Sequence, residues 1–289
     1  MIYNLGSINI DHFYRVQRVP LPGETLASSE YSVGLGGKGA NQSVAAVLAG
    51  AQVTHIGAVG SDGAWAVERL ASFGVDTRNI VTVACATGHA VIFVADNGEN
   101  GIVLHPGANA AQDRSVIRSA LSNISKTDWL MLQNETSQQL QAARQAYEKG
   151  AHVVYSAAPF NADSVTQILP YLSILIMNEV EAQQFEQSTG KNYKALPVPN
   201  VLITRGAEGS EWWDGERQKS IFVPAFKVDP IDTTGAGDTF AGYLVAGLSR
   251  GLSVAEAMEQ ATAASAIKIG RKGTADAIPS RAEVLGFLS

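Results

Sequence analysis

The chain has 289 residues, of which 46% are hydrophobic, and it carries a formal net charge of −6 with a sequence pI near 5.4. This length provides ample core for one large α/β domain or two small ones, and the acidic balance argues against a nucleic-acid partner. Cys85 is the only cysteine, which excludes an intramolecular disulfide and a cysteine-based zinc site.

The chain shows neither a membrane span nor a secretion signal. No segment reaches the ~18 uninterrupted apolar residues that a span needs, and the first residues (MIYNLG) read as a strand and not as a signal peptide. We therefore expect a cytoplasmic protein with no membrane partner. The five histidines have no metal-ligand spacing.

The N-terminal residues predict an apolar strand over residues 2–5 that leads into alternating polar positions. Asn9 and Asp11 share one face of an extended chain. An amide and a carboxylate so placed bind neighbouring hydroxyls of a polyol. The same two residues are also typical of an Asx turn, so two interpretations stay open here.

The first glycine cluster covers residues 34–42, reads GLGGKGANQ and opens a helical run. It lacks the P-loop spacing, and Lys38 stands where a dinucleotide pyrophosphate requires bare backbone, which disfavours an NAD-dependent oxidoreductase. Its backbone N–H groups, with Lys38 and Asn41, have the chemistry to contact sugar oxygens or a phosphate. A merely solvated Lys38 is the alternative.

Two hairpin patterns indicate a small separate sheet. Residues 13–33 read as strand, turn and strand, and residues 91–104 have two apolar runs around Asn97 and Gly98, which tolerate the positive φ of a tight turn. Beyond Asn109, short apolar strands alternate with helical segments, which is the βαβ rhythm of a parallel sheet. These strands cover residues 129–132, 153–156, 174–177 and 201–204, and a further short strand is predicted earlier, over residues 54–60.

Polar residues follow several of these strands, at the sheet edge where ligands of parallel sheets bind. They include Glu135, Asn178 with Glu181, and Thr204. Asn178 and Glu181 lie three positions apart at a helix start. They suit a magnesium-bound nucleotide, and they equally suit a capping pair that needs no ligand.

The second glycine cluster, residues 232–240, reads DTTGAGDTF and precedes an apolar helical run. Gly235 and Gly237 are expected to allow backbone conformations that a Cβ forbids, so that N–H groups converge on a phosphate at a helix start. Asp238 lies in the first turn and is a candidate general base for a hydroxyl that attacks a phosphoryl group. Its alternative role is to cap the helix.

These motifs, GGKGANQ, MNEVEA and DTTGAGDTF in this order, resemble those of the ribokinase-like carbohydrate kinase family. The resemblance implies an α/β fold, a Rossmann-like α/β/α sandwich with a mostly parallel central sheet and a small β-sheet lid. It implies one domain over residues 1–289, with the lid formed by approximately 11–35 and 88–106. A homodimer through the lid is also implied.

The resemblance assigns a role to each matching position. Asp238 would be the base, and the sugar, the nucleotide and the metals would have separate ligand sets. The anion hole would be Gly235, Ala236 and Gly237; the sugar ligands Asn9, Asp11, Gly37, Lys38, Asn41 and Glu135; the ATP ligands Asn178, Thr204, Arg205, Gly206, Ala207, Glu208, Gly209 and Thr262; the Mg²⁺ ligand, through water, Glu181; and the monovalent-cation ligands Asp232, Thr234, Lys268, Arg271, Gly273 and Ala277.

The implied activity is ATP- and Mg²⁺-dependent phosphorylation of a sugar hydroxyl. The small or aliphatic residues Ala90, Ile92 and Leu104 favour a compact pentose. The leading candidate substrate is D-ribose, phosphorylated at its primary hydroxyl. A kinase for fructose, a 2-keto-3-deoxy sugar acid or a nucleoside is the alternative, and a catalytically silent sugar or nucleotide sensor is the non-enzyme alternative. Ala277 stands where the family usually carries a hydroxyl near the cation, and Lys268 brings an ammonium to the same loop, so we expect K⁺ to activate weakly.

Overall fold

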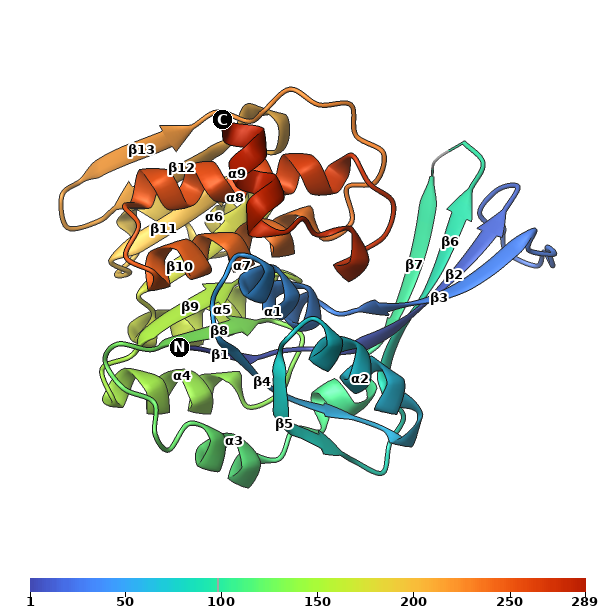
Figure 1. Ribbon diagram of the computed structural model, residues 1–289, viewed down its shortest axis with the longest axis horizontal. Helices are drawn as coiled ribbons and strands as arrows, with labels where there is room; N and C mark the ends of the chain where they lie inside the picture. Colours follow the sequence, from blue (N-terminus) through green and yellow to red (C-terminus); the bar gives the residue numbers. More distant parts are fainter. Residues whose placement is uncertain (98) are drawn as a thin grey trace.

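The computed structural model describes residues 1–97 and 99–289 and contains two sheets (Figure 1). Within these residues the central sheet has nine strands, in the order β13-β12-β11-β10-β9-β8-β1-β4-β5. The neighbours from β11 to β5 pair in parallel, whereas β12 and β13 are antiparallel additions at one edge. The strands of this sheet are β1 (Ile2–Leu5), β4 (Val53–Val59), β5 (Asp76–Thr82), β8 (Trp129–Gln133), β9 (His152–Ser156), β10 (Ile174–Asn178), β11 (Asn200–Thr204), β12 (Ser210–Asp214) and β13 (Lys219–Val223).

Helices cover both faces of the central sheet and enclose two hydrophobic cores. One core joins the sheet to α1, α2, α7, α8 and α9, and the other joins it to α3, α4, α5 and α6. In β8 the alternation of a strand is visible, because Met131 belongs to the first core while Leu130 and Leu132 belong to the second. The helices are α1 (Lys38–Leu48), α2 (Ala64–Ser72), α3 (Arg114–Ala120), α4 (Gln139–Glu148), α5 (Ala162–Ile168), α6 (Glu179–Thr189), α7 (Ala236–Ser249), α8 (Val254–Ile269) and α9 (Arg281–Leu288).

This architecture confirms the predicted α/β/α sandwich with a mostly parallel sheet. Three strands were not predicted. Strand β5 is polar in sequence (DTRNIVT), and β12 with β13 forms an antiparallel hairpin in a region where the pattern indicated only βα alternation. Among residues 1–97 and 99–289, no helix combines the length and apolar character that a membrane span requires.

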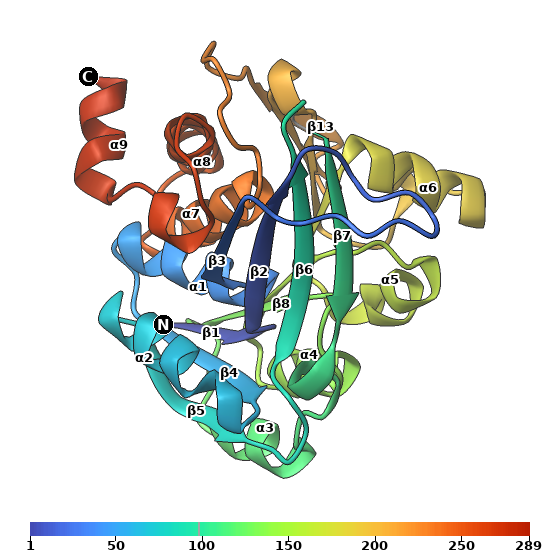
Figure 2. The same cartoon turned by 90° about the vertical axis from the view of Figure 1, so that its right-hand side faces the viewer.

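The second sheet stands beside the central one and projects from it (Figures 1 and 2). In the described residues it has four strands in the order β3-β2-β6-β7, with β2 and β6 parallel and the other pairs antiparallel. Gly98, predicted in the turn between β6 and β7, lies outside the described residues. The strands are β2 (Asn9–Val16), β3 (Glu30–Gly36), β6 (Gly88–Ala95) and β7 (Asn100–His105).

Helices α1 and α7 approach closely because small residues line their contact. A Cβ at Gly242 of α7 would lie 2.5 Å from the Cβ of Ala45 and 2.6 Å from the carbonyl oxygen of Gln42, both on α1. These distances are too short for real atoms, so any side chain at position 242 must push the two helices apart. The contact therefore sets how closely the two helices approach each other.

We predict that Gly242→Ala lowers the free energy of unfolding by about 1–3 kcal/mol, the usual result of overpacking a tight contact. Urea denaturation measures this change. Gly286→Ala is the matched control, since Gly286 lies in α9 with open space around its Cα. There, alanine should be stabilising by roughly 0.5–1 kcal/mol through its helix propensity. Equal effects at the two positions would contradict the close-packing argument.

Candidate active site

Several chain segments converge at one edge of the central sheet. Strands β1, β8, β10 and β11 are mutually aligned in the parallel part of the sheet, so their C-terminal ends meet at the same edge. Ser7 follows β1, Glu135 follows β8, and Asn178 and Thr204 end β10 and β11. The N-terminal ends of α1 and α7 provide the remaining groups of the site.

Asp238 lies in the first turn of α7 and is only 8% exposed. Its Oδ2 accepts a hydrogen bond from Asn41 Nδ2 and its Oδ1 accepts one from Gln42 Nε2, each at 3.2 Å. The N-cap of α7 is Gly235 in the left-handed conformation (φ 74°), with no side-chain cap. The interpretation of Asp238 as a helix cap is therefore wrong, and its carboxylate faces α1 instead.

The two glycines of the turn have different roles. Gly235 has the positive φ expected of it, and a Cβ there would lie 3.4 Å from Asn41 Nδ2. Gly237 is an ordinary helical residue, and a Cβ at this position would meet no atom within 4 Å. The prediction that Gly237 needs a conformation closed to other residues is wrong, because α7 begins at Ala236, one residue earlier.

Lys38 is the positive charge at the centre of the site. It is the first residue of α1 and follows Gly37, which has φ 93°. The Asp238 carboxylate raises the pKa of the Lys38 ammonium, burial opposes this effect, and Glu135, Glu181 and Asp11 add to it. Lys38 is thus part of a cluster of charged groups and is not a merely solvated side chain.

Glu135 connects the loops that follow β1 and β8. Its Oε2 accepts hydrogen bonds from the Ser7 hydroxyl and, at 3.1 Å, from the backbone N–H of Lys38. Burial raises the pKa of Glu135, whereas Lys38 acts in the opposite direction. Burial, together with the neighbouring Glu135 carboxylate, raises the pKa of Asp11 to about 7.

Asn9 and Asp11 lie in strand β2 and are 3% and 6% exposed, so the Asx-turn interpretation is wrong. Asn9 Oδ1 accepts a hydrogen bond of 2.8 Å from Asn109 Nδ2. Asp11 lies over Gly36, where any Cβ would overlap its carboxyl group. The glycine in β3 therefore makes room for the Asp11 carboxylate.

Strand register places the predicted pocket residues on the Asp11 face of the second sheet. Asp11 pairs with Ala90, Ala90 with Leu104, and Ile92 lies two residues further along the same strand. Ala90 and Ile92 are buried, whereas Leu104 is 48% exposed. His89 belongs to the opposite face and has its ring centroid 4.9 Å from that of His105.

Asn41 has an unused acceptor in the interior of the site. Its Nδ2 donates to Asp238, but its Oδ1 is buried and, within the described residues, has no hydrogen-bond partner. A buried amide oxygen without a partner is unfavourable by about 1–3 kcal/mol. A ligand hydroxyl that donates to this oxygen would remove the penalty.

A cavity of about 650 Å³ lies on the other side of the glycine turn. It extends from the loop after β11 to the facing sides of α7 and α8. Thr204, Gly206, Ala207, Gly209 and Thr262, all predicted ATP ligands, line it together with Ala236 and Gly237. Lining residues that the sequence did not indicate are Ala225, Phe226, Lys227, Val228, Asp229, Pro230, Thr233, Phe240, Ser265, Ala266 and Ile269.

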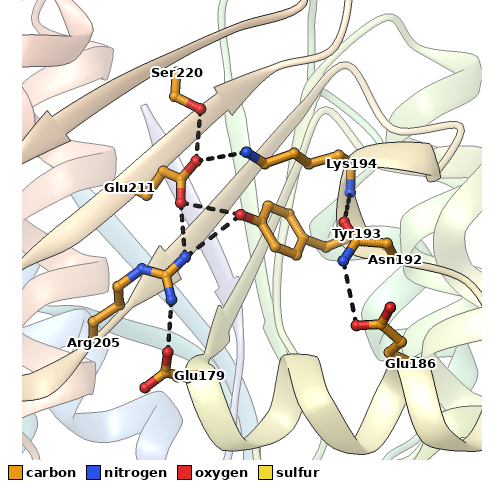
Figure 3. Close-up of polar contacts among 8 residues, drawn as sticks. All are labelled: Glu179, Glu186, Asn192, Tyr193, Lys194, Arg205, Glu211 and Ser220. Carbon is orange, nitrogen blue, oxygen red and sulfur yellow. Dashed lines mark hydrogen bonds and ion pairs between the residues drawn. The ribbon is translucent and has the colours of Figure 1, made fainter.

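Arg205 and Glu208 do not line this cavity. The Arg205 guanidinium is held by Glu179 and Glu211, each at 2.7 Å (Figure 3). Glu211 also accepts hydrogen bonds from Tyr193 and Ser220, and it pairs with Lys194 at 3.1 Å. Although burial acts against it, this set of donors lowers the pKa of Glu211 to about 2. The Arg205 side chain therefore anchors β11 to β12 and α6.

Asn178 and Glu181 form a capping box at the start of α6. Asn178 Oδ1 accepts from the Glu181 N–H and Glu181 Oε2 accepts from the Asn178 N–H, both at 2.8 Å. Burial raises the pKa of Glu181, Lys38 opposes this shift, and Asp238 adds to it. In the part of the chain that the structure describes, no three His, Cys, Asp or Glu side chains are grouped as metal ligands.

The predicted cation loop surrounds a lysine. Lys268 is fully buried, and its Nζ donates a hydrogen bond of 2.8 Å to the backbone oxygen of Asp232. Asp232 Oδ1 accepts from the Thr234 N–H at 2.9 Å, and Oδ2 accepts from the Gly273 N–H at 3.0 Å. Arg271 is paired with Glu283 and Ala277 is buried.

Gln42, Ser7 and Asn109 were not singled out in the sequence, yet all three fix site residues. Little in the sequence indicated their role, because nothing local distinguishes them from exposed polar residues. Gln42 holds Asp238, Ser7 holds Glu135, and Asn109 holds Asn9. Proximity to a motif was available only for Gln42, the last residue of GGKGANQ.

Comparisons with known proteins identify the family to which the chain belongs. Residues 1–281 match the description "pfkB family carbohydrate kinase". The ribokinase of Haemophilus influenzae is 40% identical over 299 aligned positions, which cover 98% of this chain and 97% of that protein. Among solved structures, ribokinase from Cryptococcus neoformans in complex with ADP has a TM-score of 0.85 at 32% identity, covering 99% and 98% of the two chains. Arabidopsis thaliana ribokinase with ribose and ATP has a TM-score of 0.85 at 27% identity, covering 100% and 98%.

The raised pKa of Asp11 predicts a pH-dependent stability. Between the ordinary aspartate pKa of 3.8 and the folded-state pKa of about 7, the unfolded chain releases the Asp11 proton while the folded chain keeps it. The contribution of Asp11 to the free energy of unfolding is therefore greatest below pH 3.8 and is lost as the pH rises toward 7. We expect Asp11→Asn to become more stable relative to wild type over this interval, by up to about 4 kcal/mol.

Denaturant titrations of both proteins across this pH interval measure the difference. A difference that stays constant, or that moves against the variant as the pH rises, would contradict the assignment of a raised pKa to Asp11.

Proposed function

Because the chain belongs to the pfkB family of carbohydrate kinases, whose members are ATP-dependent enzymes that use a divalent metal, we propose that it phosphorylates the primary hydroxyl of D-ribose to give ribose 5-phosphate. One observation carries the proposal. The buried Asp238 carboxylate stands between the polar groups around Asn9, Asp11 and Glu135 and the cavity that begins at Ala236 and Gly237.

Asp238 is the proposed general base. Its hydrogen bonds to the Asn41 and Gln42 amides fix both oxygens, so the carboxylate is oriented before substrate arrives. In this role it accepts the proton of the attacking hydroxyl. The backbone N–H groups at the start of α7 favour negative charge and stabilise the phosphoryl group beside it.

The sugar side of the site suits a neutral polyol. Asp11, Glu135 and Asp238 lie around the Lys38 ammonium. Together with Asn41 Oδ1, which has no hydrogen-bond partner among the described residues, they supply mainly acceptors for hydroxyl donors. Carboxylates repel an anionic acceptor, which disfavours a 2-keto-3-deoxy sugar acid. The buried side chains of Ala90 and Ile92 offer no aromatic surface for a nucleoside base.

The nucleotide belongs in the 650 Å³ cavity. Phe226, Val228, Phe240 and Ile269 give this cavity apolar walls for a base, while Ala236 and Gly237 of the glycine turn also line it and would meet the phosphates. ATP supplies the phosphoryl group, and we propose Mg²⁺ as the metal that neutralises it when bound. Glu181 would contribute to the metal shell through water, because Mg²⁺ usually keeps several waters and takes few protein carboxylates.

A panel of acceptors assayed for coupled ADP release tests the function. We expect D-ribose to give the highest kcat/KM, above 2-deoxyribose, fructose, 2-keto-3-deoxygluconate and a nucleoside. Preference for another acceptor would overturn the assignment of ribose as substrate but would leave the kinase function standing. Binding of ATP and sugar without any ADP release would favour a silent sensor.

Asp238→Asn should lower kcat by about 10²–10⁴-fold, the range that a general base contributes. Nucleotide affinity, measured by calorimetry with ADP, should stay close to that of wild type because the cavity walls are unchanged. Asp163→Asn is the control, since Asp163 is exposed on α5. A variant at position 238 with full turnover would refute the role of base.

We also propose a cytoplasmic homodimer joined through the outer face of the second sheet. Tyr31, Val33 and Val103 are 52%, 45% and 64% exposed on this face, beside the ring pair of Tyr14 and Tyr31. An exposed apolar sheet face of this kind is typical of an interaction surface.

Val103→Asp should therefore convert a dimer to a monomer in sedimentation or light-scattering measurements. Val180→Asp is the matched control, because Val180 is 60% exposed on α6, away from this sheet. A wild-type protein that is monomeric at assay concentration would rule the interface out.

A further inference from the structure

Helix α8 and the turn before α7 are joined at several points. The N–H groups of Ile231 and Asp232 both donate to the Ile269 carbonyl, at 2.7 and 3.0 Å. The Ser265 hydroxyl donates to the Ala236 carbonyl at 3.0 Å. Lys268, three residues further along α8 and so on the same side of the helix, donates to the Asp232 carbonyl at 2.8 Å. The last turns of α8 thus hold the whole segment that leads into the glycine turn.

This junction brings several oxygen atoms to the fully buried end of the Lys268 side chain, although the Asp232 side chain itself is 28% exposed. The carboxylate of Asp232 is bound to two backbone N–H groups, those of Thr234 and Gly273, and its Oδ1 lies 3.9 Å from Lys268 Nζ. The carbonyl groups at the C-terminal end of α8 add the negative end of the helix dipole. A cation beside such oxygens is favourable, since carbonyl dipoles and a carboxylate both attract positive charge.

Lys268 supplies that cation from within the chain. Its side chain is 0% exposed, so the ammonium has no access to bulk water and depends on the oxygens around it. A buried ammonium is costly unless it is paired and hydrogen-bonded, and here it is both. The carbonyl and carboxylate oxygens of Asp232 are also those that a bound monovalent cation would use.

A K⁺ ion and the ammonium therefore compete for one position. The Asp232 carbonyl already accepts from Lys268 Nζ, and a second positive charge beside a buried ammonium would be repelled. The predicted set of cation ligands, with Lys268 among them, does not fit K⁺ as long as this ammonium is in place.

We propose that the ammonium of Lys268 is a built-in substitute for a monovalent cation and that it keeps the glycine turn of residues 232–237 in its anion-binding shape. Lys268 is a positioning residue, because it acts on the phosphoryl site through the backbone of this turn. The inference deepens the proposed kinase function by assigning its cation regulation. The protein should accordingly be insensitive to K⁺.

Three variants test this inference. Lys268→Ala removes the ammonium and opens space at the Asp232 oxygens, Lys268→Met removes the charge but fills the space, and Lys272→Ala removes an exposed lysine from the same loop. Each protein is compared in tetramethylammonium, Na⁺ and K⁺ at constant ionic strength. The measurements are the ribose-dependent rate, the Tm, and K⁺ binding by calorimetry.

Wild type and Lys272→Ala should show the same rate and Tm in all three salts and no K⁺ binding. Lys268→Ala should lose about a hundredfold in rate without K⁺, the size of loss that a small misplacement of site groups causes. K⁺ should restore most of this loss, raise the Tm and bind measurably, since a ligand of the folded state is stabilising. Lys268→Met should show the loss without the rescue.

Binding of K⁺ to wild type with a rise in Tm would overturn the proposal, and so would Lys268→Met responding to K⁺ as Lys268→Ala does. Full activity of Lys268→Ala in tetramethylammonium would overturn it as well. If wild type phosphorylates no sugar, the kinase function fails, but Tm and calorimetry still decide the cation question. Should Lys268→Ala not fold, the wild-type salt series remains decisive.

Discussion

The pair of hydrogen bonds from Asn41 and Gln42 to the Asp238 carboxylate is the interaction on which the site depends. It joins the first turn of α1 to the first turn of α7, two segments almost 200 positions apart in the chain. Tight packing at Gly242 sets the distance between these helices. Core packing thus orients the carboxylate. Its position is well defined because it and its hydrogen-bond partners lie on packed helices and not on loops.

Charge balance around Lys38 explains why the two halves of the site differ. One ammonium serves Asp11, Glu135, Glu181 and Asp238, so carboxylates outnumber the cation. On the proposed sugar side this excess would favour hydroxyl donors. On the nucleotide side the same excess would repel phosphate, and the backbone N–H groups of the glycine turn, with a metal, must compensate for it. The glycine turn and its anchoring to α8 are accordingly as important as the base.

Much of the fold was readable because its apolar strands and glycine clusters carry local signals, as with the strand at residues 129–133 and the turn at Gly235. The sequence was less informative where a residue's meaning depends on distant partners. In the sequence, Gln42 and Asn109 are ordinary polar residues, and only the fold shows that they are buried and hydrogen-bonded to Asp238 and Asn9. Residues 225–230 form a cavity wall without regular structure, and therefore without any periodicity to detect.

The chain crosses between its two sheets at glycines that pack against one another. A Cβ at Gly37 would strike the backbone of Ser7 and Asn9, one at Gly88 would strike Asn9, and one at Gly107 would lie 2.9 Å from the N of Gly88. The segments that connect the two sheets are therefore packed close together at one place. If the projecting sheet moves, we expect it to rotate as one rigid body about these contacts, where the atomic displacement is smallest. Asn9, the proposed sugar ligand next to these glycines, would then move much less than the distant end of the sheet.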